Sequence, residues 1–84
     1  MLIHRVEPIF PQLAIQTRRE GTVELRAIIA TDGSVSSLQF LSGDSMFAQS
    51  ALDAVRRWRY KPTSLNGHPV EVDTHITVIY KINR

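Results

Sequence analysis

The last third of the chain carries its clearest alternation of apolar and polar residues. From Val70 onward the even positions are apolar or β-branched: Val72, Thr74, Ile76, Val78, Tyr80 and Ile82. The positions between them are polar or charged apart from Ile79: Glu71, Asp73, His75, Thr77 and Lys81. Because strand side chains alternate between two faces, this pattern predicts a long, half-buried antiparallel strand with one face in water.

Two more strands are predicted in the first half of the chain. One follows from the apolar residues that alternate with Thr22, Glu24, Arg26 and Ile28: Val23, Leu25, Ala27 and Ile29. The dipeptide Asp32-Gly33 then predicts a hairpin, because glycine adopts the positive φ of tight hairpin turns. Its second strand is expected from Val35 to Ser42. Leu38 and Phe40 fit its inner face and Val35 is out of phase, which predicts a β-bulge between Val35 and Leu38.

Two helices are predicted around these strands. Pro11 fits the first position of a helix from Gln12 to about Arg19, with Gly21 as its end. A longer helix is expected from about Met46 to Trp58, capped by Asp44 or Ser45. Its apolar residues recur at three- and four-residue spacing: Phe47, Ala51, Ala54, Val55 and Trp58.

The order helix, strand, strand, helix, strand predicts an α+β fold, a three-stranded antiparallel sheet with two helices packed on one face. At 84 residues the chain is expected to form a single domain over residues 1–84. The predicted core is Leu25, Ala27, Ile29, Leu38, Phe40, Ala51, Val55, Trp58, Ile76 and Val78. The segment through Asn66-Gly67 is read as a turn, long enough to act as a hinge.

The composition of the chain argues against several classes of site. The chain has no cysteine and a formal charge of +2, so it offers no disulfide, thiolate metal site or thiol nucleophile. No stretch has the roughly 20 apolar residues of a membrane span. His4, His68 and His75 lack the spacing of a metal site, and no catalytic motif is present. We therefore expect a protein that is not an enzyme, needs no metal or cofactor and does not itself insert into a membrane.

A basic and aromatic cluster near the end of the second helix has the composition of a nucleic-acid site. It comprises Arg56, Arg57, Trp58, Arg59, Tyr60 and Lys61. Basic groups with stacking rings are typical of single-strand binders. Trp58 falls on the apolar face of the predicted helix, however, so core packing is the favoured interpretation and no nucleic-acid partner is expected.

A series of short segments carries a family resemblance. The segments are Pro8-Ile9-Phe10-Pro11, Glu20-Gly21-Thr22-Val23, Asp32-Gly33-Ser34-Val35, Ala51-Leu52-Asp53-Ala54-Val55, Trp58-Arg59-Tyr60-Lys61-Pro62 and Asn66-Gly67-His68-Pro69-Val70. In this order, over about residues 6–82, they resemble the C-terminal domain of TonB-type energy transducers. Glu7 stands where the family usually has Gln, and Phe10 where Tyr is more frequent.

The resemblance implies a partner and a location. Such domains lie in the periplasm, at the end of a spacer and an inner-membrane anchor, and are coupled to the ExbB–ExbD proton-driven motor. They bind the Ton box, a short extended segment of TonB-dependent outer-membrane receptors. The transmitted energy drives uptake of siderophore-iron, cobalamin or other ligands.

The strand pattern independently favours binding by β-strand addition. A small open sheet has unpaired backbone groups at its edges, which can template an incoming strand. We expect the receptor segment to pair with the last strand at these residues: Val72, Asp73, Thr74, His75, Ile76, Thr77, Val78 and Tyr80. The family resemblance adds Glu7 and Ile9, in the segment around Pro8, to the expected receptor-binding residues. The outward side chains Asp73, His75 and Thr77 could tune specificity, although each is more simply read as a solvated surface residue.

A different function class stays open. The same edge could pair with a second copy of the chain, giving a homodimer or a homo-oligomerising module of the cell envelope. Self-pairing predicts a mass that depends on concentration, whereas peptide capture predicts a monomer that saturates with Ton-box peptide.

Overall fold

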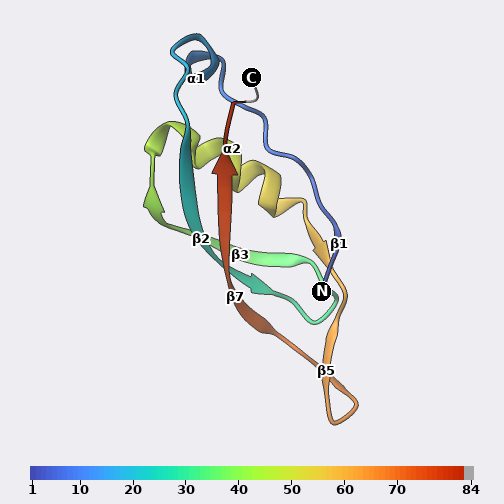
Figure 1. Ribbon diagram of the computed structural model, residues 1–84. Coiled ribbons are helices and arrows are strands. Elements are labelled where there is room, and N and C mark those ends of the chain that lie inside the picture. The colour runs from blue at the N-terminus through green and yellow to red at the C-terminus, as the bar shows by residue number, and fades with distance from the viewer. Residues whose placement is uncertain (83–84) are drawn as a thin grey trace.

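The computed structural model describes residues 1–82 and contains a three-stranded antiparallel sheet (Figure 1). β2 (Gly21–Ile29) lies in the centre, with β3 (Val35–Gly43) and β7 (Val72–Tyr80) as its edges. The long helix α2 (Ser45–Arg56) covers one face, and the short helix α1 (Gln12–Gln16) lies at one end of the sheet. The predicted α+β class, with a three-stranded antiparallel sheet and two helices, is confirmed.

The β2–β3 hairpin forms at Asp32-Gly33 as predicted. Gly33 has φ +90°, and a Cβ at this position would lie 1.9 Å from the Tyr60 carbonyl oxygen, so only glycine fits. The Asp32 carboxylate accepts hydrogen bonds from the backbone N–H of Ser34, at 2.9 Å, and from its hydroxyl, at 2.6 Å. These bonds lower the pKa of Asp32, the hydroxyl of Ser34 contributing most.

Strand β3 is irregular. Ile28 pairs with Ser37 and Ile29 with Val35, which leaves Ser36 as an extra residue and confirms the predicted bulge. A second bulge, at Leu41, was not predicted. Phe40 faces the same side as Leu25 but is 37% exposed, so its assignment to the core was wrong. It lies on an outer strand beside the second bulge, which bends the strand locally. Leu38 is half-buried and packs against the core.

Helix α2 packs on the sheet as its spacing predicted. Phe47, Ala51, Ala54 and Val55 are buried beneath it, and Asp44 caps it by accepting a 3.0 Å hydrogen bond from the Met46 N–H. Trp58, just past its end, is 5% exposed. The rest of the predicted core on β2 and β7 is buried as well: Leu25, Ala27, Ile29, Ile76 and Val78.

Helix α1 is shorter than predicted, and its end at Gly21 was wrong. Arg18 adopts φ +55°, and hydrogen bonds run from Arg19 N–H to Ala14 C=O and from Arg18 N–H to Ile15 C=O. This is a Schellman motif with arginine in the position that glycine usually takes. Gly21 instead begins β2.

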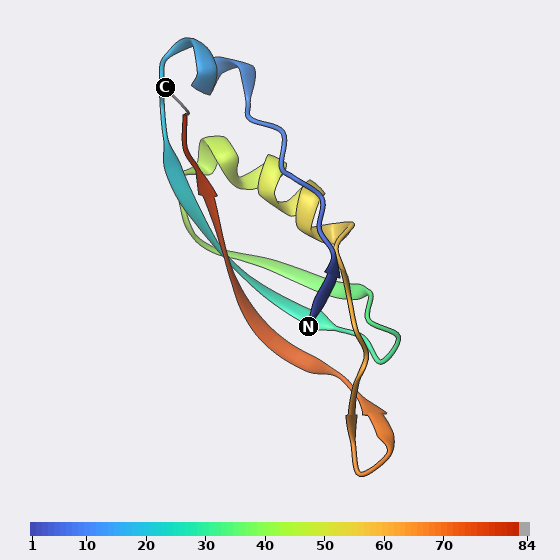
Figure 2. The same ribbon diagram turned by 45° about the vertical axis from the view of Figure 1, so that its right-hand side comes forward.

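Two pairs of small strands flank the main sheet, and the hairpin of β5 (Thr63–Leu65) and β6 (His68–Val70) extends the molecule at the end opposite α1 (Figure 2). β1 (Leu2–His4) pairs with β4 (Arg59–Tyr60), and β5 pairs with β6. Asn66 and Gly67 have φ of +53° and +80°, as a two-residue hairpin turn requires. The sequence indicated this turn but not its strands, and the turn at Asn66-Gly67 closes a short hairpin. Within residues 1–82, no helix is long and apolar enough to cross a membrane.

Candidate functional site

The outer edge of β7 is the one regular, unpaired strand edge of the sheet within residues 1–82. Strand β7 pairs with β2 without interruption from Gly21↔Tyr80 to Ile29↔Val72, with no bulge. No other strand in the described part of the chain pairs with its second side. An uninterrupted row of backbone groups is therefore presented to solvent.

The hydrogen bonds of β2 decide which residues supply that row. Thr22 C=O accepts from Asp44 N–H at 3.3 Å, and Ala30 N–H donates to Ser34 C=O at 2.8 Å. The even residues of β2 thus direct their backbone groups toward β3, and the odd residues toward β7. The odd residues of β2 pair with the even residues of β7. The N–H and C=O groups that point to the open edge consequently belong to these residues: Asp73, His75, Thr77 and Ile79.

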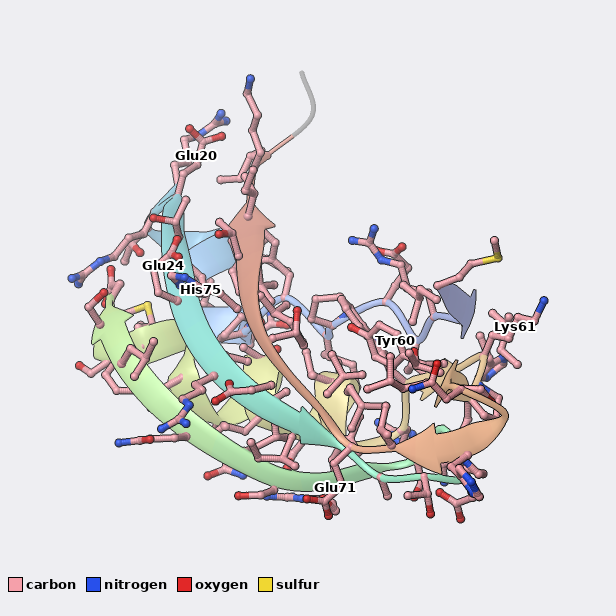
Figure 3. All side chains as sticks on the ribbon, turned by 90° about the horizontal axis from the view of Figure 1, so that it is seen from below. Glu20, Glu24, Tyr60, Lys61, Glu71 and His75 are labelled. Atoms are coloured by element: carbon pink, nitrogen blue, oxygen red, sulfur yellow. The ribbon has the colours of Figure 1, made fainter. Side chains whose placement is uncertain are left out.

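The side chains of the outward-facing polar residues contact β2. Arg26 donates to the Asp73 carboxylate, with Nε at 3.0 Å from Oδ1, and this bond lowers the pKa of Asp73. Glu24 Oε2 lies 2.7 Å from His75 Nε2 and accepts from Thr77 Oγ1 at 2.9 Å. Figure 3 shows Glu24 and His75 together on this face. These predicted site side chains are held across the strand pair, while their backbone groups remain free.

The even residues of the predicted site face the other way. Ile76, Val78 and Tyr80 are buried, and Val72 and Thr74 are half-buried. Their backbone groups hold β7 on β2, and their side chains fill or border the core. These residues therefore fix the position of β7 on the sheet and do not offer free backbone groups at its open edge.

The segment from Val6 to Phe10 runs beside α2 on the helix side of β7 (Figures 1 and 2). Trp58 Nε1 donates to Val6 C=O at 2.9 Å, and the Ser50 hydroxyl donates to Ile9 C=O. The Phe10 ring lies edge-on to Tyr80, with centroids 5.7 Å apart. Phe10 thus places the end of this segment beside the Tyr80 end of β7.

Two predicted site residues of this segment face solvent. Ile9 is 75% exposed, and Glu7 is exposed with its carboxylate 3.3 Å from Arg5 Nε. Neither makes a described side-chain contact with β7. The bonds from Trp58 and Ser50 instead hold the backbone carbonyls of Val6, just before Glu7, and of Ile9.

The predicted site residues omitted three components of this site: Ile79, Phe10 and Ser50. The backbone groups of Ile79 belong to the row at the open edge. Phe10 joins Phe47 and Tyr80 in an aromatic cluster, with the rings of Phe47 and Tyr80 stacked at 4.3 Å. Ser50 accepts a 2.9 Å hydrogen bond from the Tyr80 hydroxyl while donating to Ile9 C=O. The available signal was the position of Ser50, three residues after Phe47 on the buried side of α2.

The basic and aromatic cluster after α2 does not form a stacking platform. Trp58 is buried, its N–H is used by Val6, and Arg5 lies over its ring at 5.3 Å. Arg57 Nε donates to Asp53 C=O at 3.3 Å. Among the described residues, no group of three or more His, Asp or Glu side chains is placed to hold a metal ion.

Comparisons with known proteins agree with this architecture. Residues 6–82 match the family model described as "Gram-negative bacterial TonB protein C-terminal". The chain is 34% identical over 80 residues to Protein TonB of Vibrio cholerae and 32% identical over 83 residues to that of Escherichia coli K12. These alignments cover 93% and 96% of the chain but 33% of each relative, so the chain spans about a third of their length.

Two solved structures share the fold over the whole chain. The solution NMR structure of the Pseudomonas aeruginosa TonB CTD superposes with a TM-score of 0.80 at 25% identity, covering 87% of that chain. The TonB2 protein from Vibrio anguillarum gives 0.74 at 31% identity, covering 82% of that chain. With the family model matched over residues 6–82, the chain belongs to the family of Gram-negative bacterial TonB C-terminal domains.

Proposed function

We propose that this domain binds the Ton box of TonB-dependent outer-membrane receptors as an added strand on β7. The observation that carries the proposal is the uninterrupted row of backbone groups at Asp73, His75, Thr77 and Ile79, which faces away from β2. Main-chain bonds give affinity with little dependence on peptide sequence. That property suits a protein that serves several receptors.

The site suits the binding of a peptide strand rather than catalysis. The polar side chains near the edge already contact side chains of β2, as Asp73 with Arg26 and His75 with Glu24. We infer a non-enzymatic adaptor of the periplasm that transmits energy from the proton-motive force to the receptor. Uptake of siderophore-iron, cobalamin or other ligands would depend on that step.

Family membership supports the wider setting of this proposal. The relatives are about three times as long as the chain, which covers 33% of the Vibrio cholerae protein. We propose that the domain works with an inner-membrane anchor and the ExbB–ExbD motor. Its own part is the connection to the receptor.

The homodimer that pairs two β7 edges is the competing use of the same backbone groups. It would occupy the row at Asp73 to Ile79 and exclude a peptide. Sedimentation velocity across a concentration series distinguishes the two, because only self-pairing makes the mass depend on protein concentration.

The direct test is a binding titration with labelled Ton-box peptides from receptors of the same genome. The account predicts saturable one-to-one binding, read by fluorescence anisotropy. A matched peptide in which alternate amides are N-methylated keeps its side chains but loses its edge donors, and should not bind. Equal binding of both peptides would rule out strand addition.

A further inference from the structure

A small cavity lies beside the first half of β7, on the same side of the sheet as β1 and α2. Its volume is about 120 Å³. The residues that line it come from the first residue of the chain, the centre of the sheet, the start of β7 and the segment after α2: Met1, Ile29, Tyr60, Lys61, Thr63, Val72 and Thr74. Figure 3 shows Tyr60 and Lys61 on the β1 side, away from Glu24 and His75.

An added strand would direct one of its side chains into this cavity. Residues directly opposite each other on neighbouring strands place their side chains on the same face of a sheet. A peptide residue opposite His75 or Thr77 therefore points to the outer, polar face. A peptide residue opposite Thr74 points to the inner face, where the cavity lies.

The lining of the cavity selects the chemistry of that side chain. Its inner part is apolar, formed by Ile29, which is 4% exposed, by Val72 and by the half-buried ring of Tyr60. Thr63, Thr74, Lys61 and Met1 form the rest of the lining. No carboxylate lines it, and the volume suits a branched aliphatic group rather than an indole ring.

We infer that this cavity is a specificity subsite, which takes a valine, leucine or isoleucine side chain from the peptide strand bound to β7. The inference rests on the proposed function, because the side chain arrives with the added strand. It assigns sequence preference to the inner face at Thr74, while the outer face near His75 and Thr77 tolerates variation.

The test combines a peptide alanine scan with a variant that fills the cavity. Thr63 is exposed and pairs only with Val70 of the hairpin, so Thr63→Phe can fill the space without disturbing the core. Thr31→Phe, in the exposed β2–β3 loop, is the matched control. Affinities of a Ton-box peptide and its single-alanine versions are measured for the wild type and both variants, after their folding is checked by NMR.

One aliphatic position of the peptide should respond to the cavity. Its change to alanine should weaken wild-type binding about tenfold, the value for burying two fewer methylene groups. In Thr63→Phe, the parent peptide should bind about tenfold more weakly and the alanine peptide about as in wild type, so the difference disappears. Thr31→Phe should behave as wild type.

Two results would overturn the inference in different ways. If wild type binds the peptide but Thr63→Phe lowers the affinity of every scan peptide equally, or of none, the subsite is absent while strand capture stands. If the folded wild type binds no Ton-box peptide, strand capture itself is wrong and the subsite falls with it.

Discussion

The two edges of the sheet have the same length but different regularity. β3 and β7 each contain 9 residues, yet β3 has two register shifts against β2 and β7 has none. Bulges at Ser36 and Leu41 interrupt the row of backbone groups and increase the local twist, which disfavours pairing with another strand. The comparison teaches that irregularity protects one edge of the sheet and leaves β7 as the regular edge, which we propose as the acceptor of an added strand.

Side-chain contacts also support the regular geometry of the β7 edge. Cross-strand contacts such as Arg26 with Asp73 and Glu24 with His75 join β7 to β2. On the inner side, Tyr80 is tied through Ser50 to the segment that ends at Phe10. The β7 edge is thus supported from both faces.

The largest expected effect is a loss of folding stability when the buried Trp58 side chain, on the inner side of the sheet, is removed. Trp58→Ala removes a buried ring and the hydrogen bond to Val6, and should lower the free energy of unfolding by about 3–5 kcal/mol. Trp58→Phe keeps most of the packing and should cost about 1–2 kcal/mol. Chemical denaturation measures both. A loss below about 1 kcal/mol for the alanine variant would mean that Trp58 does not anchor the core.

The next effect breaks the β7 edge alone. The N–H of Thr77 points away from β2, so Thr77→Pro should leave the sheet folded while lowering peptide affinity at least about a hundredfold. Calorimetric titration with a Ton-box peptide measures it, with Thr77→Ala as the control that keeps the N–H.

A second proline variant checks the alternation on which that prediction depends. The N–H of Ile76 faces β2, so Ile76→Pro should destabilise the fold itself. A folded Thr77→Pro with unchanged affinity, or an Ile76→Pro as stable as Thr77→Pro, would contradict the assignment of the outward groups.

A smaller effect on stability is expected at the C-terminal end of β7, where Tyr80 lies. Tyr80→Phe removes the hydroxyl that bonds to Ser50 and should cost about 1 kcal/mol of unfolding free energy. The tyrosine of the cavity wall provides the control, because the Tyr60 hydroxyl makes no described hydrogen bond, and Tyr60→Phe should change stability little. Equal losses in the two variants would show that the Ser50 link contributes nothing.

The smallest effect is the pH dependence, which compares the β7 edge with the β2–β3 hairpin. The bond from Arg26 lowers the pKa of Asp73, and bonds from Ser34 lower that of Asp32. A folded-state pKa below the unfolded value adds stability above about pH 4, which is lost as pH falls through the folded value. NMR titration of the carboxyl groups should give both pKa values below the usual range. Arg26→Ala should raise that of Asp73 only.

Much of this fold could be predicted from the sequence where burial controls the pattern. The alternation of Val72 to Tyr80 and the spacing of Phe47 to Trp58 describe faces that must be covered, and both are confirmed. The predictions failed where geometry other than burial decides. Arg18 ends α1 in a conformation usually given to glycine, and a second bulge leaves Phe40 partly exposed.

The site was less accessible to sequence reasoning than the fold. Which backbone groups of β7 face outward depends on its hydrogen-bond register with β2, and this is set by the pairing Glu24↔Thr77 and not by the composition of either strand. The contact of Phe10 with Tyr80 joins residues far apart in the sequence. No local pattern reports such contacts.

The most direct test of the central claim is amide hydrogen exchange by NMR, with and without a saturating Ton-box peptide. In the free domain, the amides of Thr74, Ile76 and Val78 should be protected by β2, while those of His75 and Thr77 exchange freely. The account predicts that peptide selectively protects His75 and Thr77 and leaves β3 unchanged. New protection on β3, or none on β7 in a peptide-saturated domain, would contradict capture at this edge.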